Sequence, residues 1–117
     1  MSAIAEIRAT IQAHTAYAAY ADVPSTRPDE FVTIESTGGQ TDTRGMRETG
    51  SYAVQCWAKS TYRADRMAEE VMDVLNSHLA DEHAAVAKCD CDAGYNWPSS
   101  DDVPRYQCNL QVIRKRG

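Results

Sequence analysis

Apolar side chains recur at helical spacing in two segments of the chain. In residues 3–19, Ile4, Ile7 and Ile11 lie three or four positions apart with polar residues between them, and this periodicity predicts an amphipathic helix. The prolines of the following stretch, "DVPSTRPDE", should end that helix, because proline lacks a backbone N–H and disfavours helical geometry in the preceding residue. Residues 62–79 repeat the apolar pattern with charged residues on the opposite side, which predicts a second helix.

Four other segments carry the β-branched, aromatic and alternating residues that are typical of strands. They are "FVTIES" at 31–36, "SYAVQCWA" at 51–58, "AAVAKCDCDAGY" at 84–95 and "RYQCNLQVIRK" at 105–115. The last shows the clearest alternation, so one of its faces should pack on a core while the other stays polar. The second is apolar on both sides, which indicates that neither of its faces is fully exposed to water.

Two loops are expected between these elements. Residues 37–50 hold four of the six glycines and almost no large apolar side chain, so we expect a long loop there. Loops of more than about 12 residues are uncommon in compact domains and are usually functional or disordered. A second loop, at about 95–105, carries a tryptophan, two prolines and two adjacent aspartates.

The order helix, strand, strand, helix, strand, strand predicts an α+β fold, a two-layer α/β arrangement in which both helices pack on one face of a four-stranded sheet. Because consecutive strands can form hairpins, the sheet should be mostly antiparallel or mixed. Burial of the apolar faces predicts a core made of Val32, Ile34, Val54, Cys56, Leu110 and Val112 from the strands and of Ile4, Ile7, Met67, Val71 and Leu75 from the helices.

Composition places the chain among ordinary globular domains. With 117 residues, 43% of them hydrophobic and 25% charged, residues 1–117 should form a single domain. The 12 basic and 17 acidic residues give a net charge of −5, which disfavours direct binding to nucleic acid. No stretch approaches the roughly 20 apolar residues that span a bilayer, and the N-terminus lacks a secretory pattern, so we expect synthesis in the cytosol.

The sequence offers no constellation for catalysis. A cysteine nucleophile needs a base beside it, and the expected strand positions of Cys56 and Cys108 place no histidine nearby. His78 and His83 are five positions apart, not the four of a metalloprotease helix. We therefore expect no enzyme activity, no cofactor and no metal site. One alternative stays open: the four cysteines, although their Cys-x-Cys spacing is unusual for zinc, could make the chain a small zinc-binding regulatory domain.

Three segments together resemble the tail terminator, or tail-completion, proteins of long-tailed bacteriophages. They are "VPSTRPDEFVTIESTGG", "YAVQCWAKSTYRADRMAEEVMDVL" and "WPSSDDVPRYQCNLQV", and the likeness covers about residues 23–112. In that family a proline-containing lead-in enters the first strand and a Gly-Gly turn follows it. A strand ending near Gln-x-Trp-Ala then passes through a serine cap into an alanine-rich helix, and a Trp-Pro loop precedes a Pro-Arg-Tyr-Gln strand. The four cysteines and the basic end "RKRG" are not part of this pattern.

The resemblance implies a structural subunit of the virion, assembled in the host cytoplasm at the head-proximal end of the tail. Such a subunit forms a homohexameric ring on the tail tube, stops tube polymerisation and provides the surface to which head–tail connector proteins attach. DNA passes through the ring without specific binding, and no membrane is involved. A head-closure or connector protein of the same neck is the alternative. The two loops would supply the assembly interface, with the candidate residues Arg44, Arg47, Trp97, Asp101, Asp102 and Arg105.

Overall fold

The computed structural model describes residues 2–41, 45–92, 94–96 and 103–115. These residues form two helices and six strands. In chain order the elements are α1 (Ala3–His14), β1 (Ala18–Tyr20), β2 (Phe31–Thr41), β3 (Arg47–Trp57), α2 (Thr61–Glu82), β4 (Val86–Cys91), β5 (Tyr95–Asn96) and β6 (Arg105–Lys115).

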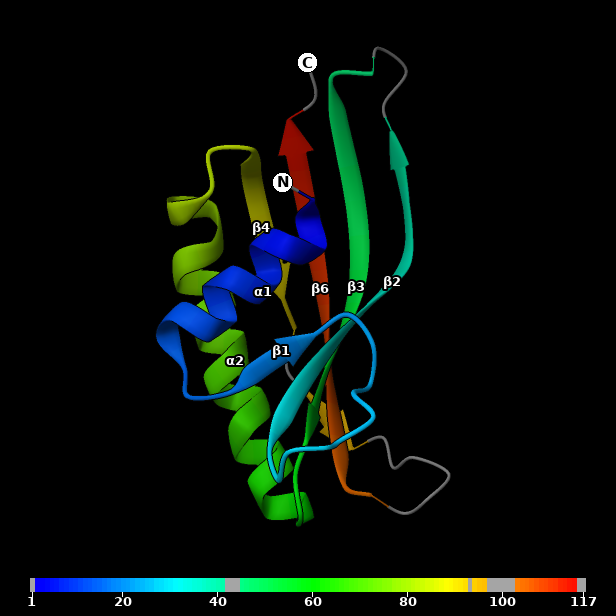
Figure 1. Cartoon of the computed structure of the whole chain (residues 1–117). Helices are drawn as coiled ribbons and strands as arrows, with labels where there is room; N and C mark the ends of the chain where they lie inside the picture. The colour runs from blue at the N-terminus through cyan, green and yellow to red at the C-terminus, as the bar shows by residue number, and fades with distance from the viewer. Residues whose placement is uncertain (1, 42–44, 93, 97–102, 116–117) are drawn as a thin grey trace.

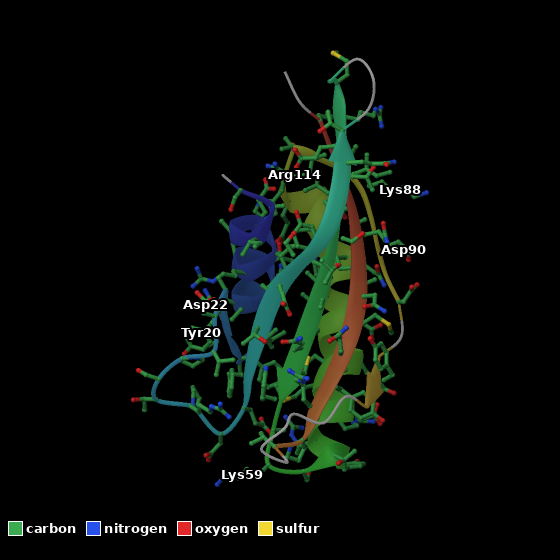
Figure 2. All side chains as sticks on the ribbon, turned by 90° about the vertical axis from the view of Figure 1, so that its right-hand side faces the viewer. Tyr20, Asp22, Lys59, Lys88, Asp90 and Arg114 are labelled. Atoms are coloured by element: carbon green, nitrogen blue, oxygen red, sulfur yellow. The ribbon has the colours of Figure 1, made fainter. Side chains whose placement is uncertain are left out.

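The strands form one curled mixed sheet (Figure 1). Its order is β1-β2-β3-β6-β4, and the two-residue β5 pairs with β6 beside β4. The β1–β2 pair is parallel, and every other pair in the described chain is antiparallel. The expected four-stranded sheet is therefore wrong, although the α+β class agrees with the structure. Both helices lie on one side of the sheet, so that β2, β3 and β6 lie in front of α2 in Figure 2.

Strand β1 begins where the sequence predicted the end of the first helix. The alanine-rich end of residues 3–19 reads as helix, but α1 ends at His14, where the Thr15 hydroxyl donates to the Ile11 carbonyl at 2.7 Å. The chain then pairs Ala19 with Val32. On the outer edge, the Ala19 N–H donates to Gln12 Oε1 at 3.1 Å, and its carbonyl accepts from Arg8 Nε at 2.8 Å. Alanine has the highest helix propensity of all residues, but propensity is a weak determinant, and these contacts outweigh it.

Most of the expected loop at 37–50 is strand in the structure. β2 continues to Thr41 and β3 begins at Arg47. On its other edge, β3 pairs with β6 over its whole length. Two of the glycines serve close packing: a Cβ on Gly39 would lie 2.7 Å from the Thr49 carbonyl oxygen, and a Cβ on Gly50 would lie 2.7 Å from the Tyr52 hydroxyl. Glycine at these positions lets the Thr49 backbone come close to Gly39 and the Tyr52 ring come close to Gly50, so these two glycines do not indicate a loop.

The remaining elements lie close to their expected positions. Helix α2 begins after Ser60, whose hydroxyl accepts the Arg63 N–H at 3.1 Å as an N-cap. Strand β6 has the expected bounds, whereas the third expected strand is split into β4 and β5. All the expected core residues are buried in one cluster except Ile4, which is partly buried against it.

A buried ion pair links the first helix to the last strand. Glu6 is only 4% exposed, and its Oε1 lies 3.0 Å from both Nε and Nη2 of Arg114. An acid in a core needs such a partner, because an unpaired buried charge is costly. The pair fixes α1 against the sheet. Among the described residues, neither helix is long and apolar enough to span a membrane.

Candidate assembly surface

The side of the sheet without helices carries an aromatic and cationic row at one end. Phe31, Trp57 and Arg105 are direct cross-strand partners on β2, β3 and β6. The rings of Phe31 and Trp57 stack with centroids 5.5 Å apart, and the guanidinium carbon of Arg105 lies 4.9 Å from the Trp57 ring centroid. Arg27, from the segment between β1 and β2, lies 5.5 Å from the same centroid. Such cation–π contacts favour a fixed ring position.

The next row on this side is a directional chain of hydrogen bonds. Trp57 Nε1 donates to Thr33 Oγ1 at 2.9 Å, and Thr33 Oγ1 donates to Gln55 Oε1 at 2.8 Å. Gln55 Nε2 then donates to Gln107 Oε1 at 3.2 Å, and Gln107 Nε2 donates to the Tyr95 hydroxyl at 2.8 Å. The chain crosses four strands, so each amide has one orientation that satisfies its neighbours.

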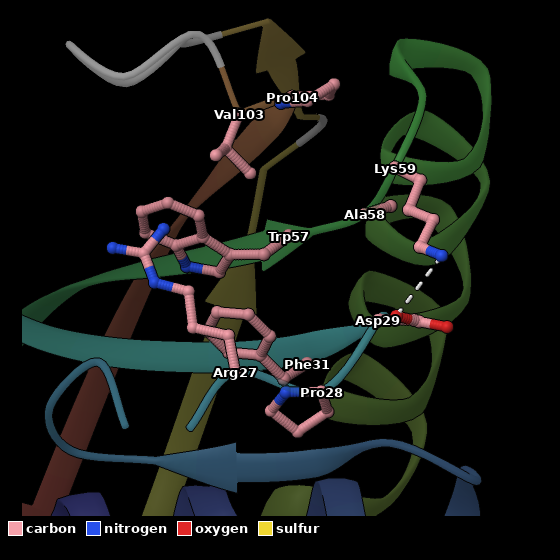
Figure 3. Close-up of a pocket in the computed structure, with 9 residues that line it drawn as sticks. All are labelled: Arg27, Pro28, Asp29, Phe31, Trp57, Ala58, Lys59, Val103 and Pro104. Carbon is pink, nitrogen blue, oxygen red and sulfur yellow. Dashed lines mark ion pairs between the residues drawn. The ribbon is translucent and has the colours of Figure 1, made fainter. Parts of the chain in front are cut away.

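A hollow of about 490 Å³ opens beside the aromatic row (Figure 3). Phe31 and Trp57 contribute ring surface, and Lys59 at the rim forms an ion pair with Asp29 at 3.4 Å. The lining residues are Arg27, Pro28, Asp29, Phe31, Trp57, Ala58, Lys59, Val103 and Pro104. This mixture of apolar floor and cationic rim suits an apolar or aromatic side chain with an acidic neighbour. Its described lining residues include no pair of nucleophile and base.

The second feature of this surface is the outer edge of β2. β1 pairs only with residues 31–33 of β2, and the seven residues from Glu35 to Thr41 are all exposed. The upper end of the β2–β3 hairpin extends past both helices (Figure 1). Edges of this kind are templates for pairing with another chain.

The structure places the candidate interface residues as follows. Arg44, Trp97, Asp101 and Asp102 lie outside the described residues. Arg105 lies in the aromatic row, whereas Arg47 begins β3 and pairs with Lys115 at its opposite end. Eleven strand residues separate the two ends by about 33 Å, so the structure does not bring these two arginines together.

Sequence reasoning missed Arg27 and the Phe31–Trp57 stack. The segment at 51–58 indicated this surface, because it is apolar on both faces. The structure confirms that Trp57 and Gln55 are buried on the face away from the helices. The identity of their partners depends on strand order, because β6 inserts between β3 and β4. Local sequence does not contain that information.

The cysteines are packing residues in the described structure. Cys56, Cys91 and Cys108 are buried and Cys89 is half-buried. Burial raises the pKa of the Cys56 thiol, and a hydrogen bond with Cys108 together with burial raises that of Cys91, so neither is a thiolate at neutral pH. Within the described residues no three potential ligands that include a cysteine lie together. The arrangement gives no support to a cysteine zinc site.

Comparison with known proteins adds no relative: no protein family model matches the chain, and no curated protein is detectably similar to it.

Proposed function

We propose that the chain is a tail terminator of a long-tailed phage, a structural subunit that caps the tail tube as a ring and offers the surface for head attachment. The main support for this proposal is that each of the three segments with the family pattern contributes one residue to the aromatic and cationic row. Phe31 comes from the first segment, Trp57 from the second and Arg105 from the third. Segments that are separated in sequence thus form one surface.

The surface has the properties that a ring requires. A closed ring of identical subunits needs two different and complementary faces on each subunit. We assign one contact face to the exposed edge of β2 and a different one to the hollow beside Trp57, which is about 490 Å³ in volume. The net charge of −5 suits a bore through which DNA slides without adhering.

The test combines assembly with tube length. Purified protein is analysed by light scattering and negative-stain microscopy, alone and with growing tail tubes. We expect rings or capped tube ends and tubes of limited length. Arg27→Glu, which reverses a charge at the rim of the hollow, should leave the fold intact and weaken capping. Arg66→Glu, on the exposed side of α2, is the matched control and should cap normally.

Two results would overturn the proposal. One is a protein that stays monomeric, does not bind tube ends and does not limit tube length. The other is a particle that lacks the protein and has tubes of normal length but unjoined heads, which is the phenotype of a head-closure protein.

A further inference from the structure

The C-terminal ends of the two helices bring together three side chains that can bind a metal ion. His14 is the last residue of α1, and His78 and Glu82 lie one turn apart at the end of α2. His14 Nε2 lies 2.7 Å from Glu82 Oε2, and His78 Nδ1 lies 4.0 Å from the same oxygen. Among the described residues this is the group in which three potential ligand atoms lie within 4.8 Å of one another.

The electrostatics of this place favour a cation. The last carbonyls of a helix carry a partial negative charge, and α1 and α2 both end at this group. Glu82 adds a full negative charge, and the two imidazoles are neutral when they act as ligands. The rings of His14 and His78 stack with centroids 3.8 Å apart and planes 4° from parallel. Both imidazoles lie beside the Glu82 carboxylate, where a single dication can contact all three side chains.

The ligand types fit a transition metal better than calcium or magnesium, because imidazole nitrogen suits zinc and nickel whereas calcium and magnesium take oxygen ligands. Zinc binds imidazole nitrogen and carboxylate oxygen at about 2.0 to 2.2 Å, so two ligand atoms at a tetrahedral angle lie about 3.4 Å apart. The observed 2.7 and 4.0 Å lie on either side of that spacing. A metal lies in the plane of each ligating ring, so the stacked rings must rotate to converge. The His14 and His78 side chains are 27% and 40% exposed, which leaves room for rotation.

We propose that His14, His78 and Glu82 form a surface site for a divalent transition metal such as Zn²⁺ or Ni²⁺, with water in the remaining positions. In the metal-free protein, Glu82 accepts a hydrogen bond from His14 Nε2 and holds the ring near the ligating position. When Nε2 binds the ion, the neutral ring carries its proton on Nδ1 instead, so the bond to the metal replaces this hydrogen bond. The ion ties the end of α1 to the end of α2 across 68 positions of sequence, and it stabilises the folded state.

The experiment titrates tag-free full-length protein with NiCl₂ by calorimetry and with CoCl₂ by absorption spectroscopy. We expect one ion per chain, a higher melting temperature with Ni²⁺, and weaker binding on acidification because protons compete for imidazole. His78→Gln and Glu82→Gln should each weaken binding by about tenfold or more. Glu69→Gln, an exposed acid on the same helix, and Cys89→Ser should bind like the wild type. Melting of each variant without metal verifies its fold.

Three outcomes would overturn the site. They are no binding heat with Ni²⁺, equal affinity in the wild type and in the His14→Gln/His78→Gln double variant, and a thiolate-to-cobalt charge-transfer band, which would assign the ion to cysteine.

Discussion

Thr33 lies between Trp57 and Gln55 as both acceptor and donor: its hydroxyl accepts the indole N–H at 2.9 Å and donates to the Gln55 carbonyl oxygen at 2.8 Å. Thr33 is 3% exposed, so water does not replace it readily. This side chain is therefore the link that joins the aromatic row to the amide row.

Thr33→Val should destabilise the fold although it conserves shape. The valine leaves the indole N–H of Trp57 and the Gln55 oxygen without their partner, and a buried unsatisfied group costs about 1 to 3 kcal/mol. Urea unfolding measures this loss. Thr37→Val, on the exposed part of the same strand, should change stability by about 0.5 kcal/mol or less. Equal effects of the two substitutions would contradict the proposed role of the hydroxyl.

A charge in the core between the helices and the sheet should prevent folding. Leu110 and Val71 are 0% exposed in the core cluster, so Leu110→Asp or Val71→Asp would bury a carboxylate without a partner. We expect insoluble protein or the absence of a cooperative melting transition. Asn109→Asp changes the neighbouring, exposed position of β6 and should remain folded. A soluble, cooperatively melting Leu110→Asp protein would show that the assigned face is wrong.

The sequence predicted those elements whose information is local. Strand β6 was found with its bounds because its side chains alternate, and α2 was found because its apolar residues recur at helical spacing. β1 was missed because it depends on side chains of another element, Gln12 and Arg8, that bind the backbone of Ala19.

The glycine-rich arm of the hairpin was missed for a related reason. A glycine is typical of both a turn and a close approach, and only the partner strand decides between them. Gly50 lies against the Tyr52 ring, which sequence spacing does not show. The candidate sites are still less local: Phe31, Trp57 and Arg105 meet through strand register. The His14 and His78 pair meets only because α1 packs on α2.

We expect the Asn76 side chain to protect the outer edge of β4 from solvent. Its amide nitrogen donates to the Cys91 carbonyl at 3.1 Å, and its amide oxygen accepts the Cys91 N–H at 2.8 Å, as a neighbouring strand would. Asn76→Ala should cost about 1 to 2 kcal/mol and speed hydrogen exchange of the Cys91 amide. Ser77→Ala, exposed on the same helix, is the control. Unchanged exchange at Cys91 in the Asn76 variant would show that the edge is protected by other means.

The buried thiol of Cys56 should make the protein sensitive to alkaline pH. Burial raises its pKa above the ordinary value of 9.0, so above that value the unfolded chain loses a proton that the folded chain keeps. Stability from this group is complete below pH 9.0 and declines as the pH rises, until the folded thiol also ionises. The decline should be on the order of 1 kcal/mol between about pH 8 and about pH 10.

Cys56→Ala isolates that contribution. The variant loses packing at neutral pH, since Cys56 is 0% exposed, but it has no thiol to ionise at this position. Urea unfolding of both proteins at the two pH values should therefore show a shallower alkaline decline for the variant, because tyrosines, lysines and the other cysteines are common to both. Parallel declines would mean that Cys56 ionises as readily in the folded chain as in the unfolded one. That result is incompatible with a thiol enclosed between β3 and α2, because a charge created there has neither water nor a cation to stabilise it.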